Sequence, residues 1–264
     1  MSGGANPGCA RCVIEARGLG RVFSHDGAQF RAVHDVSFAV EEGRFVTIVG
    51  PSGCGKSTLL LMLAGLEPAS EGKCLVDGEL LSGPRPNKIG LVFQEPTLLP
   101  WLDAAQNIEF PLSLAGEPRE ARRRRAFELL KLVGLEAFSA HYPHQLSGGM
   151  KQRVAIARGL VRDPRILLMD EPFAALDEQN RMRMGEELLR IWTETRKSVV
   201  FITHSLNEAI YLSDTVLVMG ARPGRIVETI PIDLARPREF AMLSGEYFGS
   251  VRNRIWQLIS RDVP

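Results

Sequence analysis

A stretch at residues 50–58 combines glycines with a lysine and three hydroxyl side chains at a spacing suited to binding phosphate. It matches the Gly-x-x-x-x-Gly-Lys-[Ser/Thr] phosphate loop throughout. In such loops glycines let the backbone come close to the phosphates, and the N–H groups and the following helix start form an anion site. We expect Lys56 to reach the β- and γ-phosphates of a nucleoside triphosphate and the Ser57 hydroxyl to ligate Mg²⁺. The residues predicted to line the nucleotide here are Gly50, Pro51, Ser52, Gly53, Cys54, Gly55, Lys56, Ser57 and Thr58.

An acidic pair follows a second apolar segment. Residues 165–170 read Arg-Ile-Leu-Leu-Met-Asp, and Glu171 comes next. A carboxylate at the carboxyl end of a parallel strand lies where α/β sheets bind ligands, so Asp170 would hold Mg²⁺. Glu171 points elsewhere and could polarise an attacking water. A strand-terminal Asp-Glu pair usually only caps a loop, but the phosphate loop earlier in the chain favours the catalytic interpretation.

Two more polar residues end apolar segments. His204 follows residues 198–203, and Gln94 follows residues 89–93. His204 could contact the γ-phosphate and the Glu171 region, or it could be a satisfied structural group. The Gln94 amide could ligate Mg²⁺ or orient water, and the sequence leaves this open against an ordinary role at a strand end.

The phosphate loop needs a strand before it and a helix after it. Phe45-Val-Thr-Ile-Val49 is apolar and β-branched, as buried parallel strands are, and residues 58–64 read as a helix. The glycines therefore lie on a strand-to-helix turn, which is the context that this motif requires. Residues 74–80 predict a β-hairpin around an Asp-Gly turn.

These motifs, in this order, resemble the ATP-binding subunits of ABC transporters over about residues 13–235. The family's motifs lie at 50–58 (Walker A), Gln94 (glutamine loop), 146–153 (signature), 166–171 (Walker B and its glutamate), 175–177 (D-loop) and His204 (switch histidine). The resemblance implies an α/β fold, in which a RecA-like P-loop NTPase core carries an antiparallel β subdomain and an inserted helical lobe. It assigns catalysis to Glu171, His204 and Lys56 and metal binding to Ser57, Gln94 and Asp170, with ATP and Mg²⁺ as cofactors.

The family mechanism also implies a role for Leu146-Ser-Gly-Gly-Met150. Ser147 is a good N-cap, Gly148 and Gly149 leave backbone N–H groups bare, and a helix follows. One chain cannot easily use two anion-binding helix starts on one γ-phosphate. The resemblance therefore implies a homodimer, in which each signature closes over the nucleotide bound to the partner's Walker A motif.

The resemblance assigns adenine stacking to Phe23, with Phe30 as the rival candidate, although most family members carry Tyr at this place. Residues 92–101, 146–158 and 234–238 are most similar to importers of nitrate, sulfonate, taurine and related small anions. We therefore expect integral-membrane permease partners, a separate solute-binding protein and a peripheral location on the cytoplasmic face of the membrane. The alternative is an ABC ATPase that acts on nucleic acid or ribosomes; such proteins commonly carry two cassettes or a long coiled-coil insert.

Composition fits a compact enzyme. The chain has 264 residues, of which 45% are hydrophobic, and a net charge of +1, which gives no indication of a nucleic-acid partner. We find no apolar run of about 18 residues and no pattern of a secretory signal. Four cysteines fit a reducing cytosol, and Cys9-Ala-Arg-Cys12 lacks evident partners for a metal or redox role.

The expected organisation has three parts. Residues 1–12 read as a flexible tail, residues 13–235 as the ATP-binding domain with a helical lobe at about 95–160, and residues 236–264 as a helical tail with an amphipathic helix near 246–260. The basic run Arg122–Arg125 reads as a solvated helix face, or else as a contact for anionic head groups. Residues 98–101, Leu-Leu-Pro-Trp, are either core or, as the family implies, part of the groove that receives a permease helix.

Overall fold

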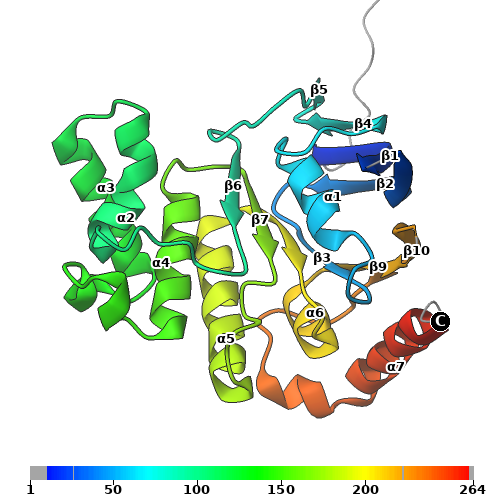
Figure 1. Cartoon of the computed structure of the whole chain (residues 1–264). Coiled ribbons are helices and arrows are strands. Elements are labelled where there is room, and N and C mark those ends of the chain that lie inside the picture. The colour runs from blue at the N-terminus through cyan, green and yellow to red at the C-terminus, as the bar shows by residue number, and fades with distance from the viewer. Residues whose placement is uncertain (1–10, 26, 222, 262–264) are drawn as a thin grey trace, which may run out of the picture.

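The computed structural model describes residues 11–25, 27–221 and 223–261, and Cys9 lies outside them. Its strands form two sheets (Figure 1). The four-stranded sheet is antiparallel, in the order β2-β1-β4-β5. Its strands are β1 (Cys12–His25), β2 (Ala28–Glu41), β4 (Glu71–Val76) and β5 (Glu79–Leu80). The predicted hairpin is confirmed, because β4 and β5 pair around Asp77 and Gly78, which both have positive φ.

The six-stranded sheet, in the order β10-β9-β3-β8-β7-β6, carries the ends of the predicted motif strands. Its strands are β3 (Phe45–Val49), β6 (Ile89–Val92), β7 (Ile166–Asp170), β8 (Ser198–Ile202), β9 (Thr215–Gly220) and β10 (Arg225–Pro231). All neighbours are parallel except β9 and β10. β6 and β8 each end one residue earlier than predicted, so Gln94 and His204 stand in the loops just beyond them.

Side-chain alternation along the strands builds two cores, one on each face of this sheet. In β3, Phe45 and Val49 belong to one cluster, and Val46 and Ile48 belong to the other. The first cluster contains helices of the lobe and of the second half of the chain, and the second contains α1 (Lys56–Leu63) and the antiparallel sheet. A strand buried on both faces reads as continuously apolar, which explains the unbroken apolar text of the motif strands.

The helices fall into two groups. α2 (Ala104–Leu114), α3 (Arg119–Leu132) and α4 (Gly148–Leu160) pack together beside β6, on the far side of the molecule from the antiparallel sheet (Figure 1). The others, apart from α1, follow β7: α5 (Glu178–Thr195), α6 (Leu206–Leu212) and α7 (Glu246–Arg261). Short 3-10 turns occupy Glu136–Phe138, Pro143–Gln145 and Phe240–Ser244. Across the described ranges, no helix combines the length and the apolar character needed to cross a bilayer.

Side-chain caps fix where these helices begin. Asp103 accepts from the backbone N–H of Gln106 and forms a full capping box with it at the start of α2. Ser147, Asp177 and Ser205 each accept a backbone N–H three residues on, at the starts of α4, α5 and α6. Three of these four helices start next to predicted site motifs, so the caps fix where each motif stands relative to its helix.

The last helix belongs to the main core. Phe248, Val251 and Ile255 of α7 are buried in the cluster that covers one face of the sheet, and α7 packs on α6 and β9. Two arginines before α7 bind the end of α6. Arg236 donates to the Leu212 carbonyl, and Arg238 donates to the carbonyls of Ile210 and Tyr211. The two guanidinium groups thereby satisfy the end of α6, where helix carbonyls lack partners of their own.

Candidate nucleotide site

The phosphate loop is held by close approach of its backbone to neighbouring strands. A Cβ added at Gly50 would lie 2.5 Å from the carbonyl oxygen of Met219, and one at Gly55 would lie 2.6 Å from that of Ala32. Gly55 also has φ +96 and immediately precedes α1. Only glycine meets both demands, so these positions fix the loop against β9 and β2 with the N-terminus of α1 directed into it.

Lys56 is buried, with only 6% of its surface exposed. Its Nζ donates to the carbonyl oxygens of Gly50, at 2.9 Å, and Pro51, at 3.0 Å. An ammonium group has three N–H donors, so one remains for an anion in the loop. Beneath the loop, burial raises the pKa of the Cys54 thiol, which keeps that side chain neutral.

Asp170 ends β7 with its carboxylate partly enclosed. Burial raises the pKa of Asp170, and a hydrogen bond from Ser57 acts in the opposite direction. Its buried Oδ1 atom has no hydrogen-bond partner in the described structure. A buried carboxylate oxygen without a partner is costly for a protein to keep, and a cation beside Ser57 and Asp170 would satisfy it.

Glu171 and His204 are brought together from two strand ends. The His204 Nδ1 atom lies 2.8 Å from Glu171 Oε2. The Glu171 backbone continues the sheet by donating to the Ile202 carbonyl, yet Glu171 has φ +42, in the left-handed region. This conformation turns its side chain away from the strand direction of Asp170. Strained backbone of this kind is concentrated at functional sites.

Gln94 is exposed in the loop that follows β6. Phe23 is half-buried on β1, directly opposite Phe30 of β2 in the strand register, and the Arg21 guanidinium lies 4.5 Å above its ring. Phe30 is 58% exposed and belongs to neither core. Phe23 therefore has the more fixed ring of the two candidates for adenine stacking.

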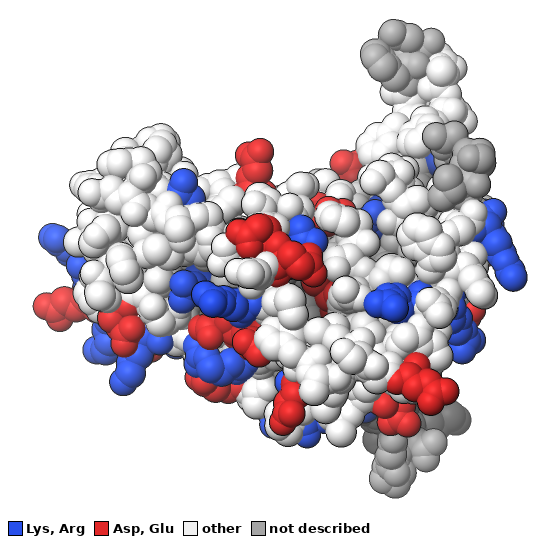
Figure 2. Space-filling model, turned by 90° about the horizontal axis from the view of Figure 1, so that it is seen from below, with Lys and Arg blue, Asp and Glu red and all other residues white. Residues whose placement is uncertain are grey.

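The signature residues lie on the same edge of the sheet as the phosphate loop but well to one side. Ser147 caps α4 by accepting from Met150 N at 3.3 Å, and Ser147 and Gly148 are exposed. The strands β8, β7 and β6 separate β3 from α4. Figure 2 views this edge from below; acidic side chains gather near its middle, with basic ones on either side. The two helix starts therefore do not converge within one chain.

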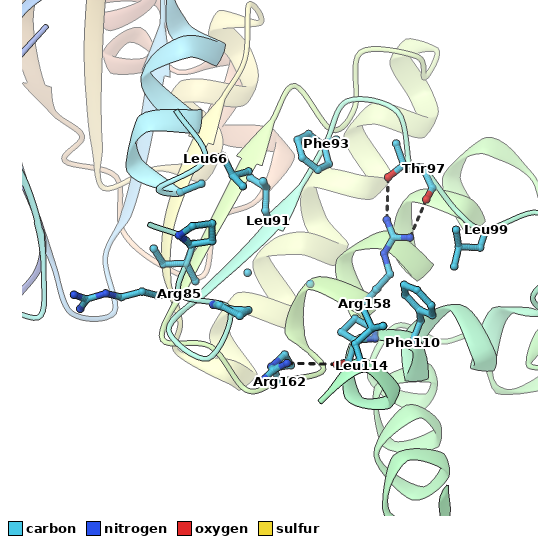
Figure 3. A pocket seen from close by; sticks show the side chains of 17 residues that line it. Leu66, Arg85, Leu91, Phe93, Thr97, Leu99, Phe110, Leu114, Arg158 and Arg162 are labelled. Carbon is cyan, nitrogen blue, oxygen red and sulfur yellow. Dashed lines mark hydrogen bonds between the residues drawn. The ribbon is translucent and has the colours of Figure 1, made fainter. Parts of the chain in front are cut away.

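A groove runs along the exposed edge of β6, between the sheet and the helical lobe (Figure 3). Its volume is about 490 Å³. Most of its lining is apolar, including Leu66, Leu91, Phe93, Leu99, Phe110 and Leu114. The charged side chains in it are Arg85, Arg158 and Arg162, and no carboxylate occurs among its lining residues.

The exposure of Trp101 and the ion pairs of the basic run bear on the two interpretations that the sequence leaves open for each. Trp101 is 68% exposed, so it is not a core residue, whereas Leu98 packs on the main core. In the basic run, Arg122 and Arg123 pair with Glu109 of α2. Arg125 pairs with Glu128 and Asp163. This pairing fits the interpretation of the run as a helix face that is neutralised within the lobe.

Sequence reasoning gave no role to two side chains of α4 that contact the loop around Gln94. Arg158 donates to the Pro96 and Thr97 carbonyls, and Gln152 donates to the Phe93 carbonyl. It also missed Arg181, whose Nη2 donates to Leu176 O at 3.1 Å, beside the D-loop. For Arg158, the sequence signal was a long polar side chain that follows directly on the apolar helix residues Val-Ala-Ile-Ala.

Comparisons with known proteins agree with this geometry. The sequence profile described as ABC transporter matches residues 33–174. The aliphatic sulfonates import ATP-binding protein of Bacillus cereus is 42% identical over 94% of this chain and 96% of its own length. The taurine import ATP-binding protein of Rhizobium johnstonii is 49% identical over 80% of each chain.

A solved structure supports the fold as well. It is the dimer of an ATP-binding cassette in a post-hydrolysis state, bound to ADP and Pi. It superposes with a TM-score of 0.74 and 33% sequence identity, over 84% of this chain and 100% of that one. The predicted RecA-like core with an antiparallel β subdomain and a helical lobe is thus confirmed, and the chain belongs to the ABC transporter family as an ATP-hydrolysing subunit.

Proposed function

We propose that this ATPase hydrolyses Mg-ATP in a homodimer and drives a membrane permease that imports a small sulfonate-like or related anion. The observation that carries the catalytic part is the Glu171–His204 contact at the ends of β7 and β8, next to the Asp170–Ser57 pair. Both pairs stand at the carboxyl edge of the sheet, where α/β folds bind ligands.

The donor set suits Mg²⁺. Mg²⁺ is usually held by one or two carboxylates together with substrate phosphates and water. The described part of the chain contains no cluster of three or more potential metal ligands among His, Cys, Asp and Glu. The partnerless Asp170 oxygen and the Ser57 hydroxyl would hold the ion together with the nucleotide phosphates, and Gln94 is the third proposed ligand. When bound, the ion neutralises charge on the phosphates.

The side chains then divide the work. Lys56 has one N–H free to bind the β- and γ-phosphates, and the α1 N-terminus faces the same anion. Glu171 would polarise the attacking water, and His204 holds the Glu171 carboxylate through Nδ1, which leaves its other ring nitrogen to contact the γ-phosphate. Phe23 stacks on the adenine.

The signature completes the site in the partner subunit. Within one chain, three strands separate the phosphate loop from Ser147, so Ser147, Gly148 and Gly149 serve the nucleotide of the second copy. The dimer of the related cassette bound to ADP and Pi supports this arrangement. A two-fold symmetric dimer then contains two such composite sites.

The groove beside β6 is the docking site for the permease. Its apolar lining and three arginines, without a carboxylate, complement a helix that carries an apolar face and an acidic group. Trp101, two residues after the groove-lining Leu99 in the sequence, adds an exposed aromatic anchor. The chain thus acts as a peripheral subunit on the cytoplasmic face of the membrane.

The cargo follows from the relatives named as sulfonate and taurine import proteins. An ATPase subunit does not contact the cargo, so a separate solute-binding protein selects it. The test is reconstitution in liposomes with the permease and solute-binding protein encoded beside this chain. We expect ATP hydrolysis to rise when taurine, an aliphatic sulfonate or nitrate is supplied with the binding protein. Stimulation only by a cationic or uncharged solute would contradict the assignment of cargo, and hydrolysis without any coupling to uptake would contradict the transport role.

A further inference from the structure

Arg158, in the last turn of α4, holds the loop after β6 by three hydrogen bonds. Its Nη1 donates to Thr97 O at 2.9 Å, and its Nη2 donates to Thr97 Oγ1 at 3.0 Å (Figure 3). The Nη2 group also donates to Pro96 O at 2.7 Å. A guanidinium group presents its donors in a rigid planar fork, whereas a lysine ammonium presents them from a single nitrogen on a flexible stem and so fixes the geometry less well.

The backbone that Arg158 holds is strained. Thr97 has φ +46, in the left-handed region. For a β-branched residue this is a genuine outlier, and it persists only where the surroundings impose it. The three bonds from Arg158 are the side-chain contacts that the structure shows on this turn.

A second side chain of the same helix holds the other flank of Gln94. Gln152 is 2% exposed, and its Nε2 donates to Phe93 O at 3.5 Å. The segment 93–97 is therefore fastened to α4 on both sides of the exposed Gln94 side chain. Phe93 and Thr97 also line the groove.

The same helix begins at the signature. Ser147 caps α4, and 11 residues separate it from Arg158, so roughly 16 Å of helix joins the two ends. A helix of this length moves as a rigid element. A displacement of segment 93–97 would therefore be passed to Ser147 with little loss, provided that Arg158 and Gln152 keep their bonds.

We propose that Arg158 and Gln152 are positioning residues that fasten segment 93–97 to the signature helix, so that Gln94 and Ser147 move as one unit. Arg158 does this by holding Thr97 in its strained conformation. Without it, the turn relaxes to negative φ and Gln94 loses its place, because of the two described side-chain links to α4 only the Gln152 bond to Phe93 remains. This inference rests on the proposed roles of Gln94 and Ser147.

The test uses the purified chain without a permease. Arg158→Met should lower kcat for ATP by about tenfold, the lower part of the range for misplaced catalytic groups, while KM for ATP changes less than about threefold. Arg158→Lys should fall between Met and the parent. The decisive variant is Arg158→Met combined with Thr97→Gly. Glycine adopts φ +46 without strain, so the turn should hold by itself and kcat should recover to within about threefold of the parent.

The matched control is Arg125→Met. Arg125 Nε donates to Val161 O, just beyond α4, and makes no contact with segment 93–97. Its kcat should stay near the parent value. If Thr97→Gly fails to rescue Arg158→Met, or if Arg125→Met lowers kcat equally, Arg158 acts only through packing and the proposal is wrong. A parent chain without ATPase activity would instead contradict the proposed function, so the two failures are distinguishable.

Discussion

The phosphate loop and the segment around Gln94 follow a central strand and an edge strand of the same sheet but are held in different ways. The phosphate loop leaves a central strand that is buried on both faces, and backbone approaches at Gly50 and Gly55 fix it. Segment 93–97 leaves the edge strand β6, is largely exposed and depends on side-chain bonds from α4. The phosphate-binding groups are thus held by the buried core, whereas segment 93–97, beside the proposed permease groove, is held by side-chain hydrogen bonds that can break and re-form.

The largest effect should come from the centrally held side. Glu171→Gln keeps the size and hydrogen-bonding capacity of the side chain but removes the base. Turnover should fall by about 10²–10⁴-fold, the scale of a positioned base, while ATP binding survives. Single-turnover hydrolysis and nucleotide titration measure the two quantities separately.

Lys56→Ala is the matched comparison, because it removes a phosphate contact and should weaken nucleotide binding itself. If Glu171→Gln hydrolyses ATP at the parent rate, the catalytic role given to Glu171 is wrong.

The next effect concerns the composite site. Ser147→Arg places a bulky cation at the start of α4, where a partner's phosphate would lie. Turnover should fall roughly 10²-fold, the scale of losing a preorganised electrostatic contact, with ATP binding to the monomer retained. Light scattering with Mg-ATP should show a dimer for Glu171→Gln and a monomer once Ser147→Arg is added. A Ser147→Arg chain that still dimerises with ATP would show that the signature does not close the site.

The smallest of the three effects concerns the segment after β6, which carries Trp101. Trp101→Ala should leave basal ATP hydrolysis and the melting temperature near their parent values, because its ring is mostly exposed. Binding to the permease should weaken by about 2 kcal/mol, and uptake should fall with it. Trp256→Ala, a change at an equally exposed ring on α7, is the control and should not affect permease binding. Equal losses in both variants would remove Trp101 from the interface.

Sequence reasoning succeeded where neighbouring residues in the sequence determine where a strand ends or a helix begins. The end of β7 at Asp170 and the cap at Ser147 follow from an apolar run and a capping residue, whereas β8 ends one residue before the predicted end. It could not yield the left-handed Thr97, because nothing in a threonine announces positive φ and the cause lies 61 residues away, in Arg158. The status of Trp101 also stayed open, since an apolar loop reads alike whether it faces the core or solvent.

The arginine pair that closes α6 has a consequence for how this protein can be handled. A chain cut at residue 235, where the predicted ATP-binding domain ends, would lose both guanidinium groups from the helix that starts beside His204. It would also expose the part of the main core on which Phe248 and Ile255 of α7 pack. Affinity tags and reporter fusions therefore belong beyond residue 261, and a shortened cassette would be a damaged enzyme and not a minimal one.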